Sequence, residues 1–234
     1  MELNKPREFA EFSSSLKIGI LALQGAFVEH AAVCHRLKAE TTLVRLPEEL
    51  QGLDGLIIPG GESTTIGRLM AEYHLTSAIK ELIFAGLPVF GTCAGMILLA
   101  KKATDLDLET LGAIDIEVRR NAFGRQVDSF ETYLDIPLLG EPPFPGVFIR
   151  APWIEKAGPE VEILARLPSG VAVAARQRNV LVTAFHPELT SDVRFHAYFL
   201  DLVARSRQEG ALGERSSTEE GILGEVLGED QCEE

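Results

Sequence analysis

The sequence has few cysteines: Cys34, Cys93 and Cys232 are the only three among 234 residues, and they lie far apart. An odd and scattered set argues against a disulfide framework and is typical of a reducing compartment. No pair of them has the spacing of metal ligands, so no metal site is predicted. The polar residues before Lys17 lack the apolar centre of a signal peptide. We therefore expect a cytoplasmic protein.

The sequence also lacks a basic stripe and a long apolar run. Its formal net charge is -13, and the stretch Glu209 to Glu234 contributes -8 of this, which leaves -5 for the rest. This negative charge, without a cluster of basic residues, gives no positively charged surface that could bind nucleic acid. No apolar stretch approaches the roughly 18 to 20 residues that span a membrane. We expect the protein to bind neither nucleic acid nor membrane.

The first half of the chain alternates between short apolar runs, which predict strands, and stretches with helical spacing. Such alternation is typical of an α/β fold with a parallel sheet and helices on both of its faces. The expected strands are 17–23, 41–46, 55–58 and 88–92, and the expected helices are 27–37, 64–85 with a break near His74, and 94–101.

The second half is rich in strand patterns, and we expect them to form an antiparallel extension of the same sheet. A final helix, capped by Ser191 or Asp192, should run to about Arg205. The expected strands are 114–119, 128–136, 147–150, 161–167, 171–176 and 180–185. The chain thus divides into an N-terminal extension (1–16), one α/β domain (17–207) and an acidic, disordered tail (208–234).

The sharpest motif is Gly91-Thr92-Cys93-Ala94-Gly95, which lies between a predicted strand and a predicted apolar helix. A small-x-nucleophile-x-small turn at such a junction is a nucleophile elbow, in which glycines permit a strained backbone and leave room for substrate. The start of the helix favours the thiolate by roughly 0.3–1 kcal/mol. The alternative is a small buried cysteine that only packs between glycines.

A thiol nucleophile needs a base. His186 follows the apolar strand 180–185 directly, and a side chain at that end of a strand points into the crevice where ligands bind. Glu188 stands two residues further on and can fix the tautomer of the ring. The alternative is that His-Pro merely ends a strand. The other histidines lie in predicted helices, and we expect surface or packing roles for them: His30, His35, His74 and His196.

Acyl transfer also needs backbone N–H donors for the oxyanion, typically two. Ala94, the residue after the nucleophile, is one expected donor. The turn Pro59-Gly60-Gly61-Glu62-Ser63 follows another predicted strand and could supply the second. Two alternatives stay open: a phosphate-binding loop, although the lysine of a Walker motif is absent, and a plain turn capped by Ser63.

Cys93, His186 and Glu188, in the order Gly-Thr-Cys-Ala-Gly and then His-Pro-Glu, resemble the triad of the class I glutamine amidotransferases. Over about 17–205 the chain is similar to one branch of that family, the glutaminase subunits of pyridoxal 5′-phosphate synthase. The similar stretches are LQGA at 23–26, GGESTT at 60–65, RNAFGRQ at 120–126, FIRAP at 148–152 and FHPELT at 185–190. Ile97 stands where other branches usually carry Gln, which favours the same branch.

The resemblance implies a class I glutamine amidotransferase domain with a flavodoxin-like, three-layer α/β fold. It implies that Cys93 attacks the side-chain amide of L-glutamine, that His186 transfers protons and that Glu188 orients His186. Gly61 and Ala94 match the oxyanion donors. The positions that match the family's glutamine-binding residues are Gly61, Glu62, Ser63, Arg120, Ile149 and Arg150. An arginine suits the α-carboxylate and a glutamate suits the α-ammonium group, whereas the alternative for the two arginines is a surface ion pair.

The same resemblance implies a partner. Members of this branch work in a large multi-subunit complex with a (β/α)₈-barrel synthase subunit, which uses the ammonia to make pyridoxal 5′-phosphate. Docking completes the oxyanion hole, and the free glutaminase is nearly idle. The Gln24-Gly25 turn and the helix from Phe27 are the expected docking elements. No metal or organic cofactor is implied.

Two other functions remain open. A cysteine-elbow hydrolase of esters or lactones would use the same nucleophile and base but would not need Arg120, Arg150 or the Gly-Gly-Glu-Ser turn. A non-enzymatic redox or chaperone protein would use Cys93 as an oxidation sensor and would not require His186. Hydrolysis of glutamine rather than of an aryl ester, and its loss when His186 is replaced, separate these functions from a glutaminase.

Overall fold

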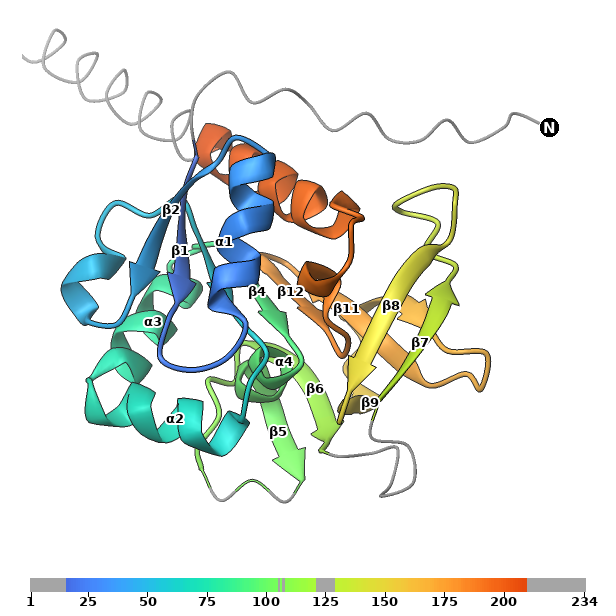
Figure 1. The fold of residues 1–234 in the computed structure, drawn as a ribbon. Coiled ribbons are helices and arrows are strands. Elements are labelled where there is room, and N and C mark those ends of the chain that lie inside the picture. The colour runs from blue at the N-terminus through green and yellow to red at the C-terminus, as the bar shows by residue number, and fades with distance from the viewer. Residues whose placement is uncertain (1–15, 105, 107, 121–128, 210–234) are drawn as a thin grey trace, which may run out of the picture.

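The computed structural model describes residues 16–104, 106, 108–120 and 129–209 (Figure 1). The predicted N-terminal extension, up to residue 15, and the predicted acidic tail, from residue 210, lie outside the described residues, as does the stretch 121–128 of the RNAFGRQ motif. The division into extension, domain and tail therefore stays a prediction. Within the described part of the chain, no helix is both long and apolar enough to span a membrane.

The described residues form one large sheet whose strand order is β2-β1-β3-β4-β12-β11-β9-β6-β5, with β10 paired to β11. The first four and β12 pair in parallel, whereas β11 pairs antiparallel with β12, β10 and β9. The strands are β1 (Lys17–Leu21), β2 (Glu40–Val44), β3 (Gly55–Ile58), β4 (Val89–Thr92), β5 (Ala100–Thr104), β6 (Ile114–Arg119), β9 (Trp153–Ala157), β10 (Glu162–Arg166), β11 (Ala172–Gln177) and β12 (Val180–Thr183). The predicted α/β fold, a mostly parallel central sheet extended by antiparallel strands, is confirmed.

Helices cover both faces of this sheet, which gives three layers (Figure 1). The faces can be read from two neighbouring residues of β4, because successive side chains of a strand point to opposite faces. Phe90 contacts the aromatic rings of Phe195 and Phe199 in the C-terminal helix, whereas Gly91 faces Leu99. The helices are α1 (Phe27–Arg36), α2 (Ser63–Glu72), α3 (Leu75–Phe84), α4 (Ala94–Leu99) and the C-terminal helix (194–209), with short 3₁₀ turns η1 (Pro47–Leu50) and η2 (Pro187–Leu189).

Two of the predicted helix boundaries lie within a few residues of those in the structure. The break near His74 separates α2 from α3, and His74 adopts the left-handed conformation with a φ of 58°. The C-terminal helix begins at residue 194, one residue later than a cap at Asp192 implies, and the Asp192 carboxylate accepts a hydrogen bond of 3.0 Å from the backbone N–H of Arg194. It continues to residue 209, beyond the predicted end at about Arg205.

Three predictions about the sheet are wrong in detail. The helix expected over 94–101 ends at Leu99, and β5 starts at Ala100; a short apolar run does not by itself distinguish a buried helix from a strand. The strand β9 was not expected at all. The strands β7 (Ser129–Leu134) and β8 (Phe144–Ile149) pair only with each other, in a separate two-stranded sheet, instead of extending the large one.

The start of α2 is stabilised by Glu62. Its carboxylate accepts hydrogen bonds from the backbone N–H groups of Thr64 (3.1 Å) and Thr65 (2.7 Å), which have no partner within the helix. Partial burial alone would raise the pKa of Glu62, but the hydrogen bonds from Thr65 and Thr64 lower it to about 2. The sequence-based alternative of a cap by Ser63 is wrong, because Ser63 is the first residue of the helix.

We predict that Gly95→Ala destabilises the fold, although alanine normally favours a helix over glycine by about 1 kcal/mol. A Cβ at residue 95 would overlap the main-chain carbonyl of Ile58, so β3 and α4 would have to separate. We expect the free energy of unfolding in urea to fall by about 1–3 kcal/mol. The matched control is Gly67→Ala in α2, where the nearest obstacle is the flexible Leu108 side chain at 2.8 Å. Equal stability of the two variants would contradict the prediction.

We also predict that Glu62→Gln lowers stability in a pH-dependent way. The folded-state pKa of Glu62 is below its unfolded value of 4.5, so the carboxylate stabilises the fold above that value and the effect is lost as pH falls toward 2. Urea unfolding should show a deficit of roughly 0.5–1 kcal/mol at pH 7, shrinking at pH 4 and below. Glu72→Gln, at the exposed end of the same helix, should show no deficit. A deficit for Glu62→Gln that grows as the pH falls would refute this account.

Candidate active site

Cys93 occupies the sharp turn between β4 and α4. Its backbone has φ 48° and ψ -99°, a strained conformation for a residue with a side chain. The turn is held by the Cys93 N–H, which donates a hydrogen bond of 2.8 Å to the Thr183 carbonyl of β12. Gly91 and Gly95 on either side leave no room for a Cβ, because each packs tightly against main-chain atoms. The structure therefore has the geometry of a nucleophile elbow at residue 93.

Three adjacent parallel strands end around this turn. In the sheet Thr92 of β4 lies beside Thr183 of β12, and Ile58 of β3 lies beside Gly91. Side chains just beyond the carboxyl ends of such strands meet at one edge. His186 follows β12, and its backbone N–H donates a hydrogen bond of 2.8 Å to the Val147 carbonyl of β8.

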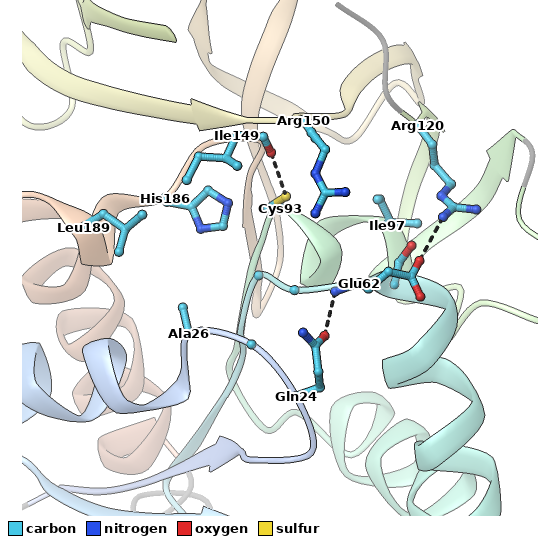
Figure 2. Close-up of a pocket in the computed structure, with 14 residues that line it drawn as sticks. Gln24, Ala26, Glu62, Cys93, Ile97, Arg120, Ile149, Arg150, His186 and Leu189 are labelled. Carbon is cyan, nitrogen blue, oxygen red and sulfur yellow. Dashed lines mark hydrogen bonds and ion pairs between the residues drawn. The ribbon is translucent and has the colours of Figure 1, made fainter. Parts of the chain in front are cut away.

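His186 and Cys93 lie side by side at this edge (Figure 2). Gly60, just beyond β3, packs closely against both residues: a Cβ there would overlap the His186 ring and approach the Cys93 Cβ to 3.3 Å. His186 Nδ1 lies 2.7 Å from Glu188 Oε1, and both side chains are buried. Because Nδ1 is directed at the carboxylate, Nε2 is left for the thiol. The structure thus brings Cys93, His186 and Glu188 together.

The pKa values of His186 and Glu188 are set by burial and by hydrogen bonding. Burial alone would lower the pKa of His186, but hydrogen bonds with Cys93 and Glu188 raise it to about 10. Burial would raise the pKa of Glu188, but the nearby His30 and the hydrogen bond with His186 lower it. These contacts stabilise the ring in its protonated form, the state in which it can give a proton to a leaving group after it has taken one from the thiol.

A cleft of about 340 Å³ opens beside the sulfur. Figure 2 shows that its walls come from segments far apart in the sequence. Of the predicted site residues, Ala94 and Glu188 do not line it: Ala94 is buried at the start of α4, and Glu188 lies behind His186. The lining residues are Gln24, Gly25, Ala26, Gly60, Gly61, Glu62, Ser63, Cys93, Ile97, Arg120, Ile149, Arg150, His186 and Leu189.

At one end of the cleft, Arg120 forms an ion pair with Glu62, with a distance of 3.2 Å between Arg120 Nη2 and Glu62 Oε1. The same guanidinium lies 3.3 Å from the Thr64 hydroxyl. The Arg120 side chain is 17% exposed and that of Glu62 is 44% exposed, and both residues line the cleft. These two predicted glutamine-binding residues therefore hold each other in place.

On the opposite side, Ile149 and Arg150 come from the end of β8. The Ile149 carbonyl lies 3.9 Å from Cys93 Sγ and accepts a weak hydrogen bond from the thiol (Figure 2). Arg150 has a φ of 43°, in the left-handed region that few residues with a side chain adopt. The wall that carries the predicted substrate-binding arginine thus lies directly beside the sulfur.

Two residues make contacts in the site that the sequence did not predict. The Gln24 side chain accepts a hydrogen bond of 2.7 Å from the Glu62 N–H, so it supports the turn that carries Gly61. The expectation that His30 has only a surface or packing role is incomplete, because its ring is fully buried and contacts Glu188. The sequence could not predict this contact, because His30 and Glu188 are 158 positions apart and the helical pattern around His30 does not indicate its partner. Among the described residues, no cluster of three or more side chains suits a metal ion.

Comparisons with known proteins agree with this geometry. The model of the SNO glutamine amidotransferase family matches residues 20–205. The chain is 54% identical over 190 residues to the pyridoxal 5′-phosphate synthase subunit PdxT of Carboxydothermus hydrogenoformans, covering 81% of this chain and 99% of that one. It is 57% identical over 190 residues to PdxT of Herpetosiphon aurantiacus, covering 80% of this chain and all of that one.

Solved structures are also similar to this chain. A crystal structure of a glutamine amidotransferase, 50% identical, superposes with a TM-score of 0.76 and covers 80% of this chain and 98% of that one. A putative GMP synthase protein from Thermoplasma acidophilum, 18% identical, has a TM-score of 0.61 and covers 87% of this chain and 100% of that one; it shares the fold alone. On the family match and the relatives above 50% identity, the chain belongs to the SNO glutamine amidotransferase family.

Proposed function

We propose that this chain is the glutaminase subunit of pyridoxal 5′-phosphate synthase, which hydrolyses L-glutamine to L-glutamate and ammonia and passes the ammonia to a synthase subunit. The observation that carries this proposal is the buried row of Cys93, His186 and Glu188 beside a cleft lined by Glu62 and Arg120. The relatives named PdxT, whose length the chain covers almost completely, supply the synthase assignment.

The proposed reaction begins with the sulfur of Cys93. Its proton passes to His186, and the sulfur attacks the amide carbon of the glutamine side chain. His186 then gives the proton to the departing nitrogen, so that the C–N bond breaks, ammonia leaves and a thioester remains. Water attacks the thioester while His186 takes one of its protons and returns it to the sulfur, which releases glutamate. Glu188 keeps His186 in the tautomer and orientation that this exchange requires.

The negative oxygen formed in each step needs donors. We propose the N–H groups of Ala94, which follows the nucleophile at the start of α4, and of Gly61. The preceding carbonyl, that of Gly60, accepts a hydrogen bond of 3.0 Å from the Ala26 N–H. Because the N–H of a trans peptide points opposite to its carbonyl, the turn at 24–26 controls the direction of the Gly61 N–H.

Six cleft residues are the proposed glutamine-binding set: Gly61, Glu62, Ser63, Arg120, Ile149 and Arg150. The arginines suit the α-carboxylate of the substrate, and the Glu62 carboxylate and the Ile149 carbonyl suit its α-ammonium group. Both charges of Glu62 and Arg120 are already oriented by their mutual ion pair. These two charged groups are therefore oriented before the substrate binds.

The proposed partner is a (β/α)₈-barrel synthase subunit in a large multi-subunit complex. We propose that it docks on the turn at 24–26 and on α1, where the Val28 side chain is 61% exposed. Since that turn holds the Gly60 carbonyl, docking there can reset the proposed oxyanion donor. The cytoplasmic location stays a prediction from the sequence.

We predict that Cys93→Ala abolishes glutamine hydrolysis, because the thioester cannot form. Ammonia release in the presence of the synthase subunit should fall by roughly 10³-fold or more, while size-exclusion chromatography should still detect the complex. The control is Cys34→Ala, a buried cysteine of α1 outside the cleft, which should stay active. Normal ammonia release by Cys93→Ala would refute the proposed function.

We predict that the isolated chain hydrolyses glutamine at least about tenfold more slowly than the complex, because docking sets the donor geometry, and lost donors typically cost 10²–10³-fold. Glutamate formation with and without the synthase subunit measures this. Val28→Asp on α1 should reduce the stimulation, whereas Phe84→Asp on α3, where Phe84 is 66% exposed, should not. Rapid turnover by the isolated chain would count against the docking model.

A further inference from the structure

Two histidines lie behind the proposed triad, on the side away from the cleft. His30 comes from α1 and His196 from the C-terminal helix, and neither has any exposed surface. His30 Nδ1 lies 2.9 Å from His196 Nε2, a hydrogen-bonding distance. Two imidazoles are expensive to bury, and the mechanism above uses neither of them.

The His30 ring reaches the triad through the second oxygen of Glu188. Oε1 of this carboxylate is occupied by His186, whereas Oε2 has no hydrogen-bond partner among the described residues. His30 Nε2 is 3.5 Å from this oxygen, with both side chains fully buried. A buried carboxylate oxygen is costly without a hydrogen-bond donor, and the His30 N–H is the group placed to serve it.

The same nitrogen also reaches the oxyanion side of the site. His30 Nε2 lies 3.1 Å from the Thr92 hydroxyl, and this oxygen accepts a hydrogen bond of 3.0 Å from the Gly60 N–H. Thr92 directly precedes Cys93, and Gly60 directly precedes the proposed donor Gly61. His30 therefore contacts both Glu188, which orients His186, and Thr92, which holds the turn at Gly60.

The positions of the protons follow from these contacts. Burial lowers the pKa of His30 and of His196, so each ring carries one proton. A lone pair on His30 Nε2 would face the negative Glu188 oxygen, so this atom carries the proton. His30 Nδ1 is then an acceptor for His196 Nε2–H, and His196 Nδ1, which has no partner among the described residues, is an unprotonated acceptor. His196 thus selects the useful tautomer of His30.

We propose that His30 is a positioning residue for the glutaminase reaction: held by His196 with its proton on Nε2, it fixes Glu188 and, through Thr92, the Gly60 turn. This inference rests on the proposed function, because it assigns His30 a role through the triad. The competing explanation is packing alone, since both rings contact Phe90 at 6.2 and 5.7 Å between centroids. Packing depends on the shape of the side chain, whereas positioning depends on which nitrogen is kept.

Two amide substitutions separate these explanations. The amide of His30→Gln reaches the place of Nε2 and can still donate to Glu188 and Thr92, whereas the amide of His30→Asn reaches only the place of Nδ1. With the synthase subunit present, we expect kcat of His30→Asn to fall roughly tenfold to a hundredfold with KM little changed, the usual cost of loosened catalytic geometry. His30→Gln should stay within about threefold of the wild type.

A second readout does not need glutamine turnover. The rate at which iodoacetamide modifies Cys93, measured on its peptide by mass spectrometry, should fall severalfold in His30→Asn and be largely restored in His30→Gln. The control His35→Asn, an exposed residue of the same helix, should leave both readouts unchanged. If the wild type does not hydrolyse glutamine, the proposed function fails, while the alkylation rates still decide whether His30 positions the thiol–imidazole pair.

Equal losses in His30→Asn and His30→Gln would overturn the inference in favour of packing, as would wild-type rates in His30→Asn. Thermal unfolding of each variant identifies losses due to unfolding. If the His30 variants do not fold, the same comparison at the other ring decides: His196→Gln keeps a donor at Nε2 and should retain more activity than His196→Asn. The reverse order, or no difference, would refute a role for this histidine pair.

Discussion

The parallel pairing of β3, β4 and β12 is the constraint on which the site depends. These strands are locked in register by main-chain hydrogen bonds, so the residues just beyond their ends, Gly60, Cys93 and His186, must meet. No long-range side-chain interaction is needed to assemble nucleophile and base, which lie 93 positions apart in the sequence. The strained turn at Cys93 is tolerated because the surrounding sheet and α4 leave it no alternative.

Behind this edge, the polar groups of the site form a continuous buried chain. It runs from Cys93 through His186 and Glu188 to His30 and His196. Buried polar groups are costly unless they are paired, and a network with few unsatisfied atoms favours one arrangement strongly. Phe90 packs against the rings of both His30 and His196 and itself stacks on Phe195. Apolar surroundings of this kind strengthen the electrostatic contacts of the two histidines.

Much of this could be predicted from the sequence, because short-range patterns encode it. The order of strands and helices in the first half, the break at His74 and the elbow at Cys93 all follow from local spacing and turn chemistry. The boundary between α4 and β5 could not, since the apolar run through Leu99 and Ala100 suits either element. The separate β7–β8 sheet and the contact of His30 with Glu188 also escaped prediction, because they depend on how distant segments pack.

The small β7–β8 sheet has a mechanical consequence. Its strand β8 carries Ile149 and leads into Arg150, and the Val147 carbonyl of the same strand holds the backbone of His186. The cleft wall at Ile149 and Arg150 and the segment that carries His186 are therefore mechanically connected through β8. A movement of β8 caused by a molecule bound in the cleft would also move the His186 backbone, because the Val147 carbonyl and the His186 N–H are joined by a hydrogen bond. Binding in the cleft and the position of the imidazole are thereby coupled.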